Sequence, residues 1–217
     1  FMLVRRPRAQ ITVTVSALVL TLVLDALLLA AVWDTGVAAV HLGGWPAPLG
    51  ISLVVDRLSA LMLVVSALIT LAVLLYASAQ GLINRDEGGP VSIFHPTFLI
   101  LVAGVSNAFL AGDLFNLYVG FEILLTSSYV LLTMGGTAQR IRAGITYVVV
   151  SVLSSVVFLI AIAMIYAATG TVNMADLAVK LGELPTDVQM VLHVLLLVGF
   201  GIKAVSYTHL RAQRLRR

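Results

Sequence analysis

The feature that most constrains this chain is a series of six apolar segments, each close to the length of a membrane-spanning helix. A helix needs ~20 apolar residues to cross a hydrocarbon core of about 30 Å. Lipid offers the backbone no hydrogen-bond partner, so such a segment must pair its N–H and C=O groups internally. The sequence therefore predicts an all-α polytopic membrane protein with spans at residues 10–33, 52–76, 94–111, 114–133, 143–167 and 188–206.

Composition agrees with this fold class and excludes several functions. Hydrophobic residues make up 60% of the 217 residues and charged residues 11%, whereas a soluble domain is about half apolar and a quarter charged. The absence of cysteine excludes disulfides, iron–sulfur ligation and thiol chemistry. The four histidines are scattered, and the sequence has no phosphate loop, nucleophile elbow or dinucleotide fingerprint. We therefore expect no metal and no cofactor. The net charge of +3 comes mainly from arginines in short loops, so it relates to membrane topology and we expect no nucleic-acid partner.

Basic residues in the loops predict the orientation of the spans. Loops on one side of the membrane carry six basic residues, and loops on the other side carry only Lys180. The positive-inside rule places the basic side in the cytoplasm. We expect a multi-pass protein of a bacterial-type plasma membrane. The six are Arg5, Arg6, Arg8, Arg85, Arg140 and Arg142.

One carboxylate lies near the middle of the fourth span, in the stretch GDLFNLYVGFEILLTSSYVLL. A charged side chain at the centre of a membrane helix costs about 2.5–3.5 kcal/mol on insertion scales. Glu122 is therefore either a relay for protons or cations, or a protonated carboxyl group that hydrogen-bonds a neighbouring helix. We favour the relay, because burial and a nearby cation act on a carboxyl group in opposite senses and can balance its two protonation states.

A basic residue in the sixth span offers Glu122 a counter-charge. Lys203 follows the stretch LLLVGFGI, where Gly199 and Gly201 leave room for a close helix or for water. It is either a snorkelling residue near a helix end or the partner of Glu122 in a switchable ion pair. Because pairing offsets much of the burial cost of both charges, we expect the second arrangement.

Four further polar residues are candidate accessory members of a proton path: Asp25, Asp113, His193 and Ser155. Asp113 precedes the fourth span and is expected to cap that helix, where a negative charge is favourable. Asp25 lies in the outer half of the first span, and packing against a polar neighbour is as good an interpretation as function. His193 lies about 15 Å along its helix and about 80° around it from Lys203, which favours a packed histidine over a relay. Ser155 belongs to a small polar face that serves helix packing or holds water.

Two loops on the predicted outer side have recognisable structure. The stretch DTGVAAVHLGGWPAPLG holds Gly and Pro and predicts a short extended turn. The stretch TVNMADLAVKLGEL predicts a short helix capped by Asn173, which we expect on the membrane surface or docked on a partner. Asp56 and Arg57, at the start of the second span, are interpreted as a local or intersubunit charge pair.

Three stretches of the chain carry a family resemblance. GDLFNLYVGFEILLTSSYVLLTMGG, YVVVSVLSSVVFLIAIAMIYAATGTVNMADLA and GFGIKA together resemble the D subunit of the Mrp-type multisubunit Na⁺/H⁺ antiporters. That family is similar to the antiporter-like membrane subunits of complex I. The resemblance implies a fold of about 14 helices with inverted repeats and broken helices, of which this chain holds the N-terminal part. It also implies that Glu122 and Lys203 correspond to the Glu–Lys pair of a proton-translocating half-channel.

The resemblance also predicts the limits of the domain. One helix of the family fold precedes the position of Phe1, so residues 1–204 are expected to be a partial antiporter-like membrane domain. After GIKA the family continues with a broken helix, whereas this chain reads VSYTHLRAQRLRR. We therefore expect residues 205–217 to be a non-native tail and the fragment to be inactive alone.

Three functions fit these residues. The first is an ion-translocating membrane component of a monovalent cation/proton antiporter, whose partners are the other subunits, the lipid bilayer, protons and monovalent cations. The alternative is the proton-pumping component of an NADH:quinone oxidoreductase or a related membrane hydrogenase, which would make the chain part of an enzyme. The third is a membrane scaffold in which Glu122 only makes a packing hydrogen bond. The stretch TGTVNMADLA favours the antiporter, and the transported cation stays open.

Overall fold

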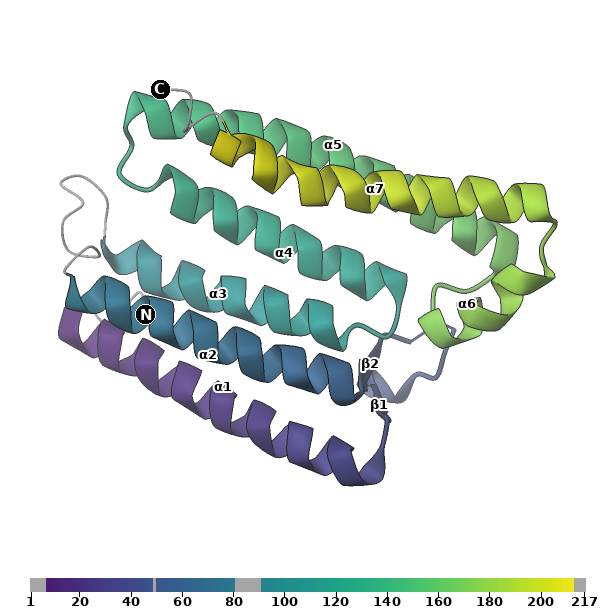
Figure 1. Cartoon of the computed structure of the whole chain (residues 1–217), viewed down its shortest axis with the longest axis horizontal. Helices are drawn as coiled ribbons and strands as arrows, with labels where there is room; N and C mark the ends of the chain where they lie inside the picture. The colour runs from purple at the N-terminus through teal and green to yellow at the C-terminus, as the bar shows by residue number, and fades with distance from the viewer. Residues whose placement is uncertain (1–6, 49, 81–90, 213–217) are drawn as a thin grey trace.

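A computed structural model describes residues 7–48, 50–80 and 91–212 (Figure 1). Arg5, Arg6 and Arg85, which are predicted on the cytoplasmic side, lie outside the described residues, as does the side chain of Arg8. The long helices are α1 (Pro7–Thr35), α2 (Arg57–Ala79), α3 (Val91–Leu110), α4 (Leu114–Thr133), α5 (Ala138–Thr169) and α7 (Thr186–Ala212). The short elements are β1 (Ala38–His41), η1 (Leu42–Gly44), β2 (Ser52–Val55), α6 (Met174–Lys180) and η3 (Leu181–Glu183).

The predicted class, an all-α polytopic membrane protein, is confirmed. Within the described residues, six helices are long and apolar enough to cross a membrane. They lie side by side along one direction, with the hairpin β1–β2 and helix α6 together at one end of the bundle (Figure 1). Large apolar side chains such as Leu27, Leu68 and Leu197 stay exposed on the outside of the bundle, where a bilayer would cover them.

The helices pack in chain order, and apolar clusters hold them, of which the two described below are the larger. Helix α1 packs on α2, α2 on α3, α3 on α4, α4 on α5, and α5 on α7. One core joins α1, α2 and α3 through Leu18, Leu74 and Phe98. The other joins α4, α5 and α7 around Phe158, which has no exposed surface. The contact of α3 with α4 therefore links two separately packed helix groups.

The predicted second span begins too early. Residues 52–55 form strand β2, which pairs antiparallel with β1 in the register Ala38↔Val55 and His41↔Ser52. Helix α2 begins only at Arg57, because the side chain of Asp56 accepts a hydrogen bond from Ser59 N and completes a capping box. The predicted extended turn after the first span is confirmed as the segment that contains β1.

The predicted short helix after the fifth span is α6, and Asn173 caps it as expected. The location of α6 on the membrane surface or on a partner stays a prediction, while its apolar stripe packs on this chain's own core. Leu177 is buried in the core around Phe158, and Met174 and Leu181 pack against the same core. Helix α6 therefore closes one end of the group formed by α4, α5 and α7.

Candidate functional site

Glu122 lies near the middle of α4, a helix whose start is fixed by a buried aspartate. Asp113 is the N-cap, and its side chain accepts hydrogen bonds from Asn116 N at 2.7 Å and from Ser52 N at 3.2 Å. The prediction that Asp113 caps α4 is confirmed, and the contact with Ser52 adds a tie to β2. Backbone hydrogen bonds from Leu114 N to Val172 O and from Met174 N to Gly112 O join the same point to the start of α6.

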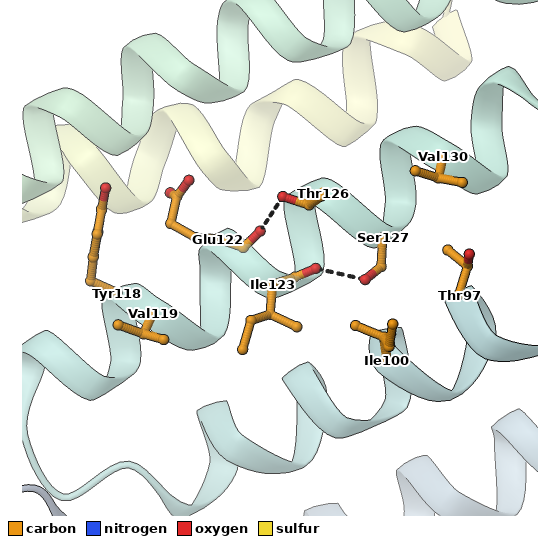
Figure 2. Close-up of a pocket in the computed structure, with 9 residues that line it drawn as sticks. All are labelled: Thr97, Ile100, Tyr118, Val119, Glu122, Ile123, Thr126, Ser127 and Val130. Carbon is orange, nitrogen blue, oxygen red and sulfur yellow. Dashed lines mark hydrogen bonds between the residues drawn. The ribbon is translucent and has the colours of Figure 1, made fainter.

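A groove between α3 and α4 opens beside Glu122. Its volume is about 530 Å³, and Figure 2 shows Glu122 among the side chains that line it. Val119 and Ile123 give the groove apolar walls, while Tyr118 and Ser127 add hydroxyl groups. The side chain of Glu122 is 33% exposed, and it forms part of the lining of this groove.

Helix α7 brings Lys203 to the same place because α7 lies very close to α5. Gly199, four residues before Lys203, faces Phe158 so closely that a Cβ would lie 3.3 Å from the Phe158 Cα. Ser154 of α5 donates a hydrogen bond to Gly199 O at 2.9 Å. Residues four apart share one helix face, so this contact also turns Lys203 toward α5 and α4.

The structure brings the two predicted charges together. Lys203 Nζ lies 4.0 Å from Glu122 Oε1, and only 15% of the lysine side chain is exposed. Lys203 Nζ also donates a hydrogen bond of 2.9 Å to Ser155 Oγ and lies 5.2 Å from the centre of the Phe121 ring. Glu122 Oε1 itself is buried without a hydrogen-bond partner. The ammonium thus lies between a carboxylate, a hydroxyl and an aromatic face.

Of the accessory candidates, Asp25 and His193 lie away from this pair. Asp25 is on α1, and its Oδ2 atom is buried without a hydrogen-bond partner. His193 is exposed on α7, and its Nδ1 contacts Gln189 O of its own helix at 2.7 Å, so it is not the packed core histidine that was expected. Ser155 is the accessory candidate that contacts the pair directly.

Asp56 and Arg57 do not pair with each other; each contacts a different residue. Asp56 caps α2, and the hydrogen bond from the backbone N–H of Ser59 lowers the pKa of its carboxyl group. Arg57 donates to Trp33 O at 3.0 Å, and its guanidinium lies 5.4 Å from the centre of the Trp33 ring. The predicted local charge pair is therefore replaced by a helix cap and an α1–α2 contact.

Sequence reasoning missed Phe121. Its ring packs against Phe158 and Phe200, with ring centres 6.0 Å apart in each case, and faces the Lys203 ammonium. An aromatic residue in an apolar helix carries no signal that separates it from ordinary core. The one available hint is its position directly before the intramembrane Glu122.

The chain is similar to membrane subunits of cation/proton antiporters. Residues 111–209 match the family model described as NADH:quinone oxidoreductase/Mrp antiporter, transmembrane. The D subunit of the Na⁺/H⁺ antiporter of Alkalihalophilus pseudofirmus is 42% identical over 173 residues, which cover 79% of this chain and 34% of that protein. The D subunit of a probable K⁺/H⁺ antiporter of Rhizobium meliloti is 45% identical over 179 residues, which cover 79% of this chain and 32% of that protein.

Two solved structures of membrane complexes contain chains with a similar fold. A chain in the structure of the Mrp complex from Dietzia sp. DQ12-45-1b superposes with a TM-score of 0.83 at 33% identity, over 92% of this chain and 37% of that one. A chain of the membrane-bound sulfane sulfur reductase, an archaeal respiratory membrane complex, gives a TM-score of 0.77 at 30% identity, over 86% and 37%. The resemblance to the D subunit of the Mrp-type antiporters is thus confirmed, for a chain that spans about a third of the length of these relatives.

Proposed function

We propose that this chain, whose residues 111–209 match the NADH:quinone oxidoreductase/Mrp antiporter family, is part of the ion-translocating component of a monovalent cation/proton antiporter. Glu122 accepts and releases the transported proton, and Lys203 responds to the charge on Glu122. The observation that carries the proposal is the 4.0 Å approach of two opposite charges inside apolar helices. Residues 1–204 form the proposed partial membrane domain, and the assignment of residues 205–217 to a non-native tail stays a prediction.

The energies of the pair support a switchable site. Two unit charges 4 Å apart attract by about 4 kcal/mol at an effective dielectric constant of about 20. Placing one charged side chain in a membrane helix costs about 2.5–3.5 kcal/mol, so two cost about 5–7 kcal/mol. The attraction offsets the cost of one charge but not of both. A pair with this balance changes its protonation readily when a proton or a neighbouring charge arrives.

Access to the pair also supports the proposal. Glu122 lines the groove between α3 and α4, and Lys203 approaches its carboxylate from α7 while hydrogen-bonded to Ser155 of α5. A packing carboxyl group of a membrane scaffold would need a hydrogen-bond partner, whereas Glu122 Oε1 has none within the part of the chain described. This difference favours the relay over the scaffold.

The test is Glu122→Gln in the full-length protein within its complex. Glutamine keeps the size and the helix but cannot take up a proton, so exchange should fall to the level of vesicles without the complex, while assembly is retained. The measurement is cation-driven recovery of a pH-sensitive dye in inverted membrane vesicles. Glu183→Gln, an exposed carboxylate in η3, is the matched control and should exchange normally. Normal exchange by assembled Glu122→Gln would remove the proposal.

A respiratory complex is the second candidate, because one of the similar structures is an archaeal respiratory membrane complex. In that case the chain would pump protons with energy from a redox partner, and its partners would be redox subunits. The genes beside the intact gene distinguish the two: small antiporter subunits support the antiporter, and redox subunits support the alternative. We further propose a bacterial-type plasma membrane as the location, with protons and monovalent cations as the transported ions.

A further inference from the structure

The Lys203 ammonium has a closer partner than Glu122. Its hydrogen bond goes to Ser155 Oγ at 2.9 Å, which is the usual length for a charged donor. Its distance to Glu122 Oε1 is 4.0 Å, which is an ion pair without a hydrogen bond. The lysine therefore rests on α5 while the carboxylate of α4 lies within reach.

Helix packing fixes the position of Ser155 relative to Lys203. Ser155 is 3% exposed, and the neighbouring Ser154 binds Gly199 O on α7. The close contact of Gly199 with Phe158 sets the spacing of α5 and α7 at this level. The hydroxyl of Ser155 is thus held at a constant place, and movement of the ammonium toward Glu122 needs only a change in the lysine side chain.

A hydroxyl group can hold the lysine in either protonation state. It accepts a hydrogen bond from an ammonium and can donate one to a neutral amine. Ionised Glu122, in contrast, forms an ion pair only with the charged lysine. We propose that Ser155 is a positioning residue that shares Lys203 with Glu122 and thereby sets how tightly the Glu122–Lys203 pair forms. This inference rests on the function proposed above.

Few other charged groups can act on this site. Within the described residues, Glu122 is the charged group that faces Lys203, and Tyr118 on α4 lines the groove beside it. On α5 the charged residues are Arg140 and Arg142, and the nearer of the two lies about 20 Å along the helix from Ser155. On α7, His193 and Asp187 lie about 15 Å and about 24 Å along the helix from Lys203. Among the described side chains, the Glu122–Lys203 pair is therefore the titratable site on which removal of the Ser155 hydroxyl would act.

The test is Ser155→Ala in the full-length protein within its complex. Without the hydroxyl, the ammonium has Glu122 as its remaining polar partner and favours the ionised carboxylate. Exchange should persist, and the pH of half-maximal exchange should move toward acid by about one unit, the low end of the worth of a hydrogen bond to a charged group. Ser155→Thr keeps a hydroxyl and should restore the original pH profile.

Ser154→Ala is the matched control. It removes the hydrogen bond between α5 and Gly199 O, but the close contact of Gly199 with Phe158 remains and keeps the spacing of α5 and α7. Lys203 then retains both of its partners, so the pH profile should match that of the parent protein. An unshifted profile for Ser155→Ala, or an equal shift for Ser154→Ala, would overturn the inference. If Ser155→Thr does not assemble, the contrast between the two alanine variants decides. If Glu122→Gln loses exchange but the pH profile of Ser155→Ala is unshifted, only this inference is removed. If Glu122→Gln still exchanges, the proposed function is removed.

Discussion

At the scale of single residues, the length of the Glu122 side chain matters because the carboxylate meets Lys203 at the limit of an ion pair. Glu122→Asp keeps the charge and withdraws the carboxylate toward α4 by one C–C bond, ~1.5 Å. A displacement of about 1 Å at a reacting group can cost about 10²-fold in rate. We therefore expect exchange by the full-length complex to fall about 10²-fold, measured as the initial rate of dye recovery in inverted vesicles.

The same shortening at an exposed carboxylate separates side-chain length from general damage. Glu183→Asp in η3 changes the chemistry in the same way, far from Lys203, and should leave the rate unchanged. Equal rates for Glu122→Asp and the parent protein would mean that the carboxylate does not have to approach Lys203.

The residues of this site differ in how well the sequence could predict them. Glu122 and Lys203 are charges in apolar spans, and their insertion cost alone marks them. Ser155 was one of several hydroxyls with two interpretations, and only the packing of α5 on α7 selects it. Phe121 could not be predicted, because the face that an aromatic ring presents depends on the rotation of its helix in the bundle.

At the scale of elements, the start of α4 depends on one buried carboxylate. Asp113 is 3% exposed and satisfies the backbone N–H groups of both Asn116 and Ser52. Asp113→Ala leaves these two groups without a partner, and each buried orphan group costs about 1–3 kcal/mol. We expect a marked fall in the thermal unfolding midpoint of the full-length protein in detergent.

Asp56 provides the comparison for this prediction, because it is an exposed cap of the same chemical type on α2. Water can replace its hydrogen bond, so Asp56→Ala should cost only about 1 kcal/mol, the usual value for a lost helix cap. Equal midpoints for the two alanine variants would show that the tie between β2 and α4 adds no stability.

Element types were predicted better than element limits. The six long helices follow from the length of the apolar runs, and α6 follows from its Asn173 cap and apolar stripe. Strand β2 was included in a span because ISLVV continues the apolar run into α2. The capping box of Asp56 with Ser59 was the readable signal for the true start. That α6 packs on its own chain could not be predicted, since a short apolar stripe fits lipid, a partner and a core alike.

At the scale of the whole molecule, the site joins segments that are far apart in the sequence. Glu122 belongs to α4 and Lys203 to α7, and α5 and α6 lie between them in the chain. The sequence indicated that two opposite charges in apolar helices should pair, but it did not give the helix rotations that make them meet. Those rotations depend on close contacts such as Gly199 against Phe158, which exist only in the assembled bundle.

The ends of the bundle make the orientation of the molecule testable. The α4–α5 connection lies at the end opposite to β1–β2 and α6 (Figure 1), and the basic residues Arg140 and Arg142 follow that connection. The positive-inside rule predicts that this end faces the cytoplasm and that α6 faces outward. Because this chain has no cysteine, a single introduced cysteine can report the side on which each end lies. Labelling of the full-length parent protein is measured in parallel and subtracted as background.

Gln139→Cys and Ala178→Cys form the matched pair, since both residues are exposed and lie on α5 and α6, at opposite ends of the bundle. A membrane-impermeant maleimide added to intact cells should label Ala178→Cys and not Gln139→Cys, and inverted vesicles should reverse the result. The reversed pattern would place Glu122 and Lys203 in a bundle of opposite orientation. A proton released from Glu122 along a given path would then emerge on the other side of the membrane. The labelling result thus decides on which side of the membrane each end of the proposed proton path opens.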